Sequence, residues 1–315
     1  MNVNKEYYFQ GWYFKCSTQD ETIAVIVGSA KEKVEEAFIQ VILSNEKKSY
    51  YIPYELKGFS YEEEPFKIQV GDNIFTKEYM HLNIVNSSIS LTGCIYFDSF
   101  TTLPQHFLWK GLMGPFGYLP FMECYHDVLS MRHNLRGSLL INGKVINFEG
   151  GQGYIEKDFG NSFPKSYIWM QCNHFREPSL SVMLAVADIP FIGWNFTGFL
   201  CVISTQDKVR IFATYTGARL EIIEIEKEYV SVQIRQGKEV IRLTTYHQKG
   251  HMLKAPNKGA MKCTVYEELD GKMKLEMYYK NQLKVDMKGR QVAFEQVGKV
   301  EDMNHKIGRI KHMNK

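Results

Sequence analysis

A short segment between glycines carries three side chains that could move a proton. Tyr154, Glu156 and Asp158 follow one another at a spacing of two, within residues 150–164 (GGQGYIEKDFGNSFP). On a β-strand this spacing puts a phenol and two carboxyl groups on one face. The pattern is compatible with part of a lined pocket and with an ordinary half-exposed strand, and the spacing alone leaves both interpretations open.

The chemistry that such a face favours is acid catalysis. Burial among apolar groups disfavours the ionised form of a carboxylic acid, and two neighbouring carboxyl groups, such as Glu156 and Asp158, titrate as a pair. Such an acid can protonate a carbon–carbon double bond. Aromatic faces then stabilise the carbocation, each by about 1–2 kcal/mol when desolvated. We predict Asp158, Glu156 and Tyr154 as the catalytic residues, provided that the opposite strand face, with Ile155 and Lys157, does not point inward.

A second polar and aromatic strand follows at once. Trp169, Gln171 and Asn173 repeat the spacing of two. We expect Gln171 and Asn173 to orient the polar end of a substrate and Trp169 to hold its apolar part, although core packing is the usual role of a single Trp. The other candidates for substrate binding are Trp12, Trp109 and His126.

Composition narrows the class of protein. The chain has 315 residues, a formal net charge of only +3 and 14% aromatic residues. The small net charge argues against a nucleic-acid partner, and the aromatic content suits β-sheets and apolar ligands. Six scattered cysteines without a C-x-x-C pair predict reduced thiols. The first residues lack the apolar core of a signal peptide, so we expect a cytoplasmic protein, with membrane association left open.

Strand signals run along the whole chain and predict an all-β fold with little helix. Two runs of eight to ten short segments rich in β-branched and aromatic residues indicate two β-barrels or sandwiches of antiparallel strands in tandem. We place the domains at residues 1–160 and 161–315. Asn142-Gly143 and Asp270-Gly271 predict hairpin turns, and residues 31–36 form the one helix-like fragment.

One apolar segment, residues 104–125, contains prolines and glycines typical of a loop. A long apolar loop must be covered, so it either packs across the seam between the two domains or forms a lid over an apolar cavity. Phosphate-binding, dinucleotide-binding and metalloprotease motifs are absent from the sequence. We therefore expect neither a cofactor nor a metal.

Several motifs together resemble the tocopherol cyclase family, whose wider group includes carotenoid hydratases. The resemblance extends from about residue 9 to residue 298. Its most specific parts are the opening G-W-Y-F-K and the 153–164 motif. The segments that carry it are residues 9–15, 113–116, 122–126, 153–160, 163–164, 169–173 and 293–298. The resemblance implies two lipocalin-like β domains and a reaction in which a prenyl double bond is protonated and a phenol oxygen closes a ring.

From this resemblance we expect a cofactor-independent isomerase-type cyclase, acting on a prenylated phenol, a quinol or another isoprenoid. The Lys-, Ile- and Asn-rich composition indicates a bacterial origin. The alternatives are a non-catalytic carrier of a hydrophobic ligand and a hydratase in which water captures the cation. The expected partner is a hydrophobic small molecule, with peripheral membrane contact as an open option. The sequence indicates no protein partner.

Overall fold

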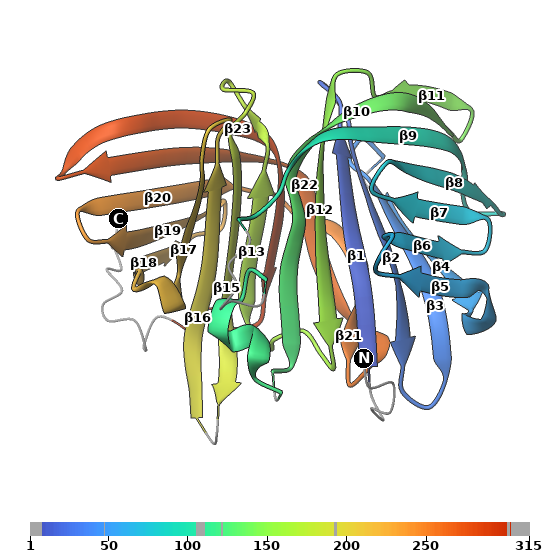
Figure 1. Cartoon of the computed structure of the whole chain (residues 1–315), viewed down its shortest axis with the longest axis horizontal. Coiled ribbons are helices and arrows are strands. Elements are labelled where there is room, and N and C mark those ends of the chain that lie inside the picture. Colours follow the sequence, from blue (N-terminus) through green and yellow to red (C-terminus); the bar gives the residue numbers. More distant parts are fainter. Residues whose placement is uncertain are drawn as a thin grey trace. The chain divides into compact units, whose positions relative to one another are not determined.

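The computed structural model describes residues 8–46, 48–104, 111–120, 122–191, 194–300 and 303. Over these residues the chain lies mostly in antiparallel β-strands, which three short 3-10 helices interrupt (Figure 1). The predicted all-β class, of lipocalin-like type, is confirmed. The helices are η1 (Leu56–Gly58), η2 (Gly114–Tyr118) and η3 (Thr214–Thr216).

The chain forms two compact units that interleave in sequence. Unit 1 comprises Met1–Leu103, Cys124–Phe163 and Met252–Thr264. Unit 2 comprises Pro104–Glu123, Pro164–His251 and Val265–Lys315. The expected division into residues 1–160 and 161–315 cuts the chain only once, and it stays a prediction about domains.

The sheet of unit 1 has its strands in the order β4-β3-β2-β1-β12-β10-β9-β8-β7-β6-β5, with β11 paired to β10. Strand β12 lies inside this order, with β1 on one side and β10 on the other, and both pairings are antiparallel. The strands are β1 (Tyr8–Ser17), β2 (Thr22–Lys31), β3 (Glu35–Leu43), β4 (Lys48–Glu55), β5 (Phe59–Glu62), β6 (Lys67–Val70), β7 (Asn73–Thr76), β8 (Tyr79–Val85), β9 (Ser90–Thr101), β10 (Cys124–Ile141), β11 (Lys144–Asn147) and β12 (Gly151–Gly160).

Side-chain alternation gives this sheet a core face and an opposite face. Trp12 and Phe14 of β1 and Ile155 of β12 belong to one large core cluster. That cluster joins strands from both ends of the sheet order, and Asn73 of β7 donates a hydrogen bond to the Tyr54 hydroxyl of β4. The sheet therefore curls on itself like a barrel, with this core inside. Each large apolar side chain so buried contributes about 1.5–3 kcal/mol.

The opposite face of β1–β3 is covered in part by residues 252–264 of the same unit. The Gln40 side chain donates to the Lys254 carbonyl at 2.9 Å and accepts from the Lys254 amide at 2.9 Å. Beside this pair, Phe9, Phe38 and Met261 form a small apolar cluster. The outer face of this barrel is therefore partly buried, which sets it apart from an ordinary solvated sheet face.

Unit 2 repeats the plan with the order β17-β16-β15-β13-β23-β22-β20-β19-β18. Ile168 and Met170 of β13 point into its own core cluster. The remaining strands of the chain are β13 (Tyr167–Cys172), β14 (His174–Phe175), β15 (Ser181–Phe191), β16 (Trp194–Ser204), β17 (Val209–Ala213), β18 (Arg219–Ile225), β19 (Tyr229–Gln236), β20 (Glu239–Tyr246), β21 (His251–Asn257), β22 (Ala260–Tyr279) and β23 (Gln282–Val297). Strand β14 pairs with β23, and β21 pairs with β22.

Two local predictions are wrong. The helix-like fragment at residues 31–36 is the β2–β3 hairpin, in which Lys31 pairs with Glu35 and forms an ion pair with it. Asp270-Gly271 is a bulge inside the long strand β22, because β23 continues its pairing past this point with shifts of register. The Asn142-Gly143 turn is confirmed, since both residues have the positive φ angles, 50° and 85°, that a tight hairpin needs.

The apolar segment at residues 104–125 is described for residues 111–120 and from Met122 onward. The Tyr215 hydroxyl donates to the Leu112 carbonyl at 2.6 Å, and the Phe116 ring lies 5.8 Å from that of Phe196. This part of the segment therefore packs within unit 2, and packing across a seam between domains stays a prediction.

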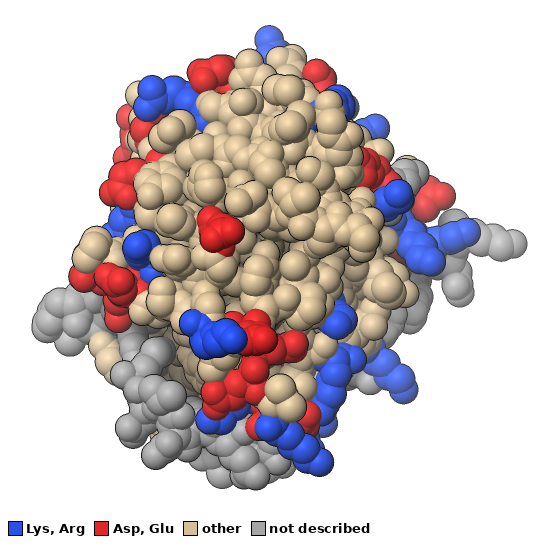
Figure 2. Space-filling view, turned by 90° about the vertical axis from the view of Figure 1, so that its right-hand side faces the viewer, with Lys and Arg blue, Asp and Glu red and all other residues tan. Residues whose placement is uncertain are grey.

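Two further features concern the surface and membranes. On the side of unit 1 shown in Figure 2, most Lys/Arg and Asp/Glu side chains lie toward the edges of the view, and an isolated acidic side chain lies within the broad area of other residues between them. A search of the described helices finds none with the length and apolar character of a membrane span.

Candidate functional site

The face of β12 that carries Tyr154, Glu156 and Asp158 is the outer face of the unit 1 barrel. Ile155, on the other face, belongs to the barrel core. The carboxylates nevertheless do not point into solvent, since the Glu156 and Asp158 side chains are 7% and 21% exposed. Tyr154 is fully buried. The strand face with Ile155 thus points into the barrel core, and the predicted site on the opposite face is nevertheless shielded from solvent.

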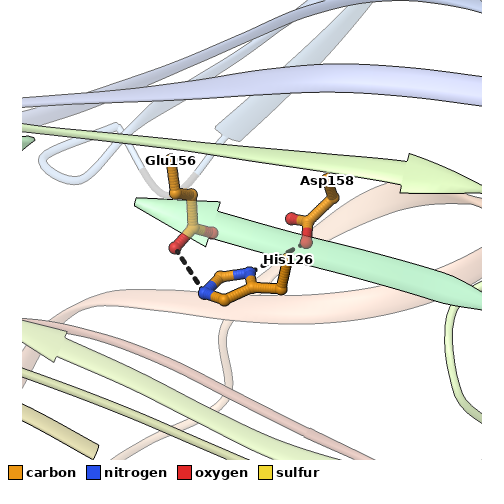
Figure 3. Close-up of side chains that lie close together, drawn as sticks. All are labelled: His126, Glu156 and Asp158. Atoms are coloured by element: carbon orange, nitrogen blue, oxygen red, sulfur yellow. Dashed lines mark hydrogen bonds and ion pairs between the residues drawn. The ribbon is translucent and has the colours of Figure 1, made fainter. Parts of the chain in front are cut away.

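Strand pairing brings a histidine to this face. His126 of β10 is the cross-strand partner of Asp158, so both side chains lie on the same side of the sheet. The distance from His126 Nδ1 to Asp158 Oδ1 is 2.9 Å, and that from His126 Nε2 to Glu156 Oε2 is 3.7 Å. The imidazole therefore bridges the two carboxylates (Figure 3).

The Tyr154 hydroxyl completes the group. It donates a hydrogen bond to Glu156 Oε2, with an oxygen–oxygen distance of 2.5 Å in a buried setting. A bond this short is typical of a hydroxyl donating to an ionised carboxylate. Cys124 adds a weaker contact, with Sγ 3.9 Å from Asp158 Oδ1. We call His126, Tyr154, Glu156 and Asp158 the acid cluster.

Charge and burial act against each other on His126. Burial alone would lower the pKa of its imidazolium, but Asp158 and Glu156 raise that pKa to about 9 by their charges, and the hydrogen bond that His126 donates to Asp158 adds to this. His126 is thus a cation at neutral pH. Burial and the Glu156 charge raise the pKa of Tyr154 well above its usual value, so it remains a neutral hydrogen-bond donor.

The side chains of His126, Glu156 and Asp158 are of the types that bind metal ions. One atom each of His126, Glu156 and Asp158 lie within 4.8 Å of one another, a spacing that a divalent cation could bridge. However, Glu156 Oε2 already accepts from Tyr154, and Asp158 Oδ1 is already paired with His126. We therefore interpret these residues as a hydrogen-bonded acid–base group.

Two residues on this face escaped the sequence reasoning. Tyr13 and Lys15 of β1 are the cross-strand partners of Glu156 and Tyr154. Lys15 is completely buried, and the Tyr13 ring lies 6.4 Å from that of Tyr154. The alternation in the opening G-W-Y-F-K contained the signal, because it puts Tyr13 and Lys15 on the face opposite Trp12.

Trp12, another predicted binding residue, lies on the face of the unit 1 sheet opposite the acid cluster. Trp12 points into the barrel core, where its ring lies 4.5 Å from that of Tyr61, and the Lys157 ammonium lies 4.7 Å from the Trp12 ring centre. Trp109 lies outside the described residues. Trp12 is therefore held by core packing, the alternative that the sequence left open for each Trp.

Trp169, Gln171 and Asn173 belong to unit 2, and all three are buried. Trp169 is the cross-strand partner of Glu295 on β23, so it lies on the sheet face opposite Ile168 and the unit 2 core. On the same face the Tyr167 hydroxyl donates to Glu295. Each unit thus carries a tyrosine–glutamate hydrogen bond on the face away from its barrel core.

Comparison with known proteins places these features in a family. The family described as tocopherol cyclase-like matches residues 105–299, which is more than half of the chain. Among curated proteins, a probable chloroplastic tocopherol cyclase of Oryza sativa subsp. japonica is 31% identical over 78 residues, 25% of this chain and 17% of that protein. A chloroplastic tocopherol cyclase of Zea mays is 32% identical over 68 residues, 22% of this chain and 14% of that protein. The matched segments are therefore well under two thirds of these relatives' lengths.

Solved structures show the same fold at low identity. Kievitone hydratase from Nectria haematococca aligns with a TM-score of 0.55 and 13% identity, covering 92% of this chain and 89% of that one. CghA aligns with a TM-score of 0.57 and 9% identity, covering 93% and 89%. At this identity the likeness concerns the fold alone.

Proposed function

Because this chain belongs to the tocopherol cyclase-like family, we propose that it is an enzyme that protonates a carbon–carbon double bond of an isoprenoid substrate and closes a ring onto an internal hydroxyl. The proton that this hydroxyl loses on ring closure returns to the carboxylate of the proton donor, so that the net reaction is an isomerisation. The observation that supports this most is the position of His126 between the buried carboxylate of Glu156 and the partly buried carboxylate of Asp158. A prenylated phenol or quinol is the substrate class that combines such a double bond with such a hydroxyl.

Asp158 is the proposed proton donor. Its contacts with described residues all use Oδ1, where His126 Nδ1 and Cys124 Sγ lie. Oδ2 is therefore the oxygen that can hold a transferable proton. The imidazolium beside Oδ1 forms a charge-assisted hydrogen bond with the carboxylate that remains after the transfer.

An apolar substrate favours the loaded form of this donor. With His126 charged and both carboxylates ionised, the acid cluster has one negative charge in excess. One added proton neutralises it, and a greasy substrate that excludes water disfavours the charged state. Binding of the isoprenoid thus promotes the protonation that its own reaction requires.

The remaining members of the acid cluster are positioning and electrostatic groups in this proposal. Tyr154 holds Glu156, and Glu156 in turn keeps a negative charge 3.7 Å from His126 Nε2. The imidazolium therefore keeps both its charge and its orientation toward Asp158. Binding roles for Trp169, Gln171 and Asn173 remain part of the proposal.

The test begins with the ligand. Extraction of the purified protein and mass spectrometry of the extract identify the co-purifying lipid. Conversion of that lipid, or of a prenylated quinol, is then followed for the wild type and Asp158→Asn. General acid catalysis contributes about 10²- to 10⁴-fold, so we expect at least a hundredfold loss of kcat with substrate still bound.

Three controls separate the alternatives. Tight lipid binding without conversion, unchanged in Asp158→Asn, would identify a carrier. Incorporation of oxygen-18 from labelled water into the product would identify a hydratase that uses the same protonation step. Turnover that is lost with a chelator and restored by a divalent cation would replace the proton donor with a metal at the acid cluster.

A further inference from the structure

Strand β10 is irregular between His126 and the next buried histidine, His133. Val128 pairs with Glu156, Ser130 with Ile155 and His133 with Gly153, with register shifts on both sides of Ser130. Five residue steps on β10 therefore face only three on β12. Two bulges, each with one extra residue, bracket Ser130.

These bulges decide where His126 points. Successive side chains of a strand alternate between the two faces, so losing one bulge shifts the pairing by one residue. Relative to the part of β10 beyond Ser130, that shift would move the His126 side chain from the Asp158 face to the core face. The acid cluster thus depends on the bulged geometry of β10.

Ser130 and His133 hold the bulges closed. The Ser130 hydroxyl donates to the Arg132 carbonyl at 3.0 Å, and it lies 3.0 Å from His133 Nδ1. Both side chains are buried. Since the hydroxyl hydrogen is used on Arg132, His133 Nδ1–H is the donor to Ser130, and Nε2 is the unprotonated nitrogen.

The His133 ring also seats β12. It stacks on Phe100 with ring centres 4.8 Å apart and meets the edge of Phe97 at 4.8 Å. Its Nε2 occupies the space beside Gly153, only 2.0 Å from where a Cβ would be. Gly153 directly precedes Tyr154. The His133 ring therefore fixes the position of the β12 backbone at Gly153, and with it the positions of the Tyr154 and Glu156 side chains.

We propose that Ser130 and His133 are positioning residues, which hold the β10 bulges and the seat of Gly153 and thereby keep His126 between Glu156 and Asp158. The proposal concerns the same cluster as the proposed function. Its test needs no substrate, so failure of the enzymatic proposal would leave this test intact.

The readout is the pKa of His126, followed by NMR of ¹³C-labelled histidine in the whole protein and assigned with a His126→Asn variant. The charges that act on His126 come from Glu156 and Asp158 on β12 and from Asp127 on β10. Tyr13 and the buried Lys15 of β1 are further titratable groups on the same sheet face. Displacement of His126 weakens its contacts with Asp158 and Glu156. In Ser130→Ala and His133→Ala we expect the pKa to fall by at least about one unit, a tenfold loss of proton affinity.

Conservative variants distinguish positioning from general damage. Ser130→Thr keeps the hydroxyl, so it should leave the His126 pKa near the wild-type value. His133→Asn keeps a donor near the Nδ1 position but loses the ring beside Gly153, so it should lower the His126 pKa less than His133→Ala does. The matched control is His247→Ala in unit 2, where a histidine also stacks on a phenylalanine, Phe294, at 4.4 Å. It should not change the His126 titration.

The close contact between the His133 ring and Gly153 gives an independent test. Gly153→Ala should lower the His126 pKa, because Cβ collides with a ring that cannot retreat. The double variant Gly153→Ala/His133→Asn lacks the two closest ring atoms, Nε2 and Cε1, and should recover most of the loss. This test decides the question if Ser130→Ala and His133→Ala do not fold. Folded Ser130→Ala and His133→Ala proteins with an unchanged His126 pKa would overturn the proposal, as would a double variant no better than Gly153→Ala.

Discussion

His133 should lower the unfolding free energy of unit 1 as the pH drops from 7.5 to 5.0. Burial, together with the charge of Arg132, lowers the pKa of His133 to about 3, against the opposing charge of Asp98. In the unfolded chain its pKa is near 6.5. Below pH 6.5 His133 therefore binds a proton in the unfolded state, whereas it stays neutral in the folded state.

The magnitude follows from linkage. Each unit of pH between the two pKa values is worth about 1.4 kcal/mol, so His133 removes about 2 kcal/mol of unfolding free energy between pH 7.5 and 5.0. That window ends above the range in which most carboxylates titrate. The figure hardly depends on the folded pKa, because a value one unit higher would still leave the folded histidine almost entirely neutral at pH 5.0.

The assay is amide hydrogen exchange of peptides from β12, which reports opening of unit 1 without requiring the whole chain to unfold in one step. The wild type is compared with His133→Asn at four pH values from 7.5 to 5.0, after correction for intrinsic exchange. We expect the opening free energy of the wild type to lose about 2 kcal/mol more than that of the variant. Parallel pH profiles would refute the buried, neutral assignment of His133, whatever the absolute stabilities.

Two further predictions concern the same unit. For His126 the pH dependence has the opposite sign, because its folded pKa is raised from 6.5 to about 9. Its contribution to the unfolding free energy is complete below pH 6.5 and is lost as pH rises through 9, by about 3 kcal/mol in total. Asp158→Asn should flatten this alkaline slope in urea unfolding. Gly28→Ala should destabilise the protein by about 1–3 kcal/mol, because its Cβ would lie 2.2 Å from the Gln10 carbonyl oxygen. Gly143→Ala, in an open turn with φ of 85°, should cost only about 1 kcal/mol. Equal thermal shifts for the two glycine variants would contradict this reading of the β1–β2 contact.

Local patterns predicted what local physics determines. Asn142-Gly143 forms its turn because both residues tolerate positive φ, and Tyr154, Glu156 and Asp158 share a face because a strand has a period of two. The same reasoning failed at Asp270-Gly271. There β22 is paired with both β20 and β23, and this long-range pairing absorbs a turn-like dipeptide as a bulge.

The direction of the β12 face was not readable from the sequence. In a sheet with one wet face, burial would identify the core side at once. In β12 both faces are buried, with Ile155 in the barrel core and Tyr154 on the other side. In a sequence, polar residues on a buried strand face cannot be told from polar residues on a solvated face. The alternation along β12 therefore did not predict which of its two faces points into the barrel core.

The placement of His126 was further out of reach, because it depends on two extra residues in β10. A count of sequence separation cannot show that five steps on one strand face three on another. What the sequence did contain was the reason for the bulge: a serine, a histidine and a glycine whose side chains, or lack of one, fit together only in this register. Ser130 bonds His133, and His133 fills the space that Gly153 leaves empty. The glycine that opens the Tyr154–Asp158 segment is therefore required by a histidine on the core face, while the carboxylates that follow it serve the opposite face. A single strand thus couples barrel packing to the acid cluster, and a change on the core side should be felt in the proton affinity of His126.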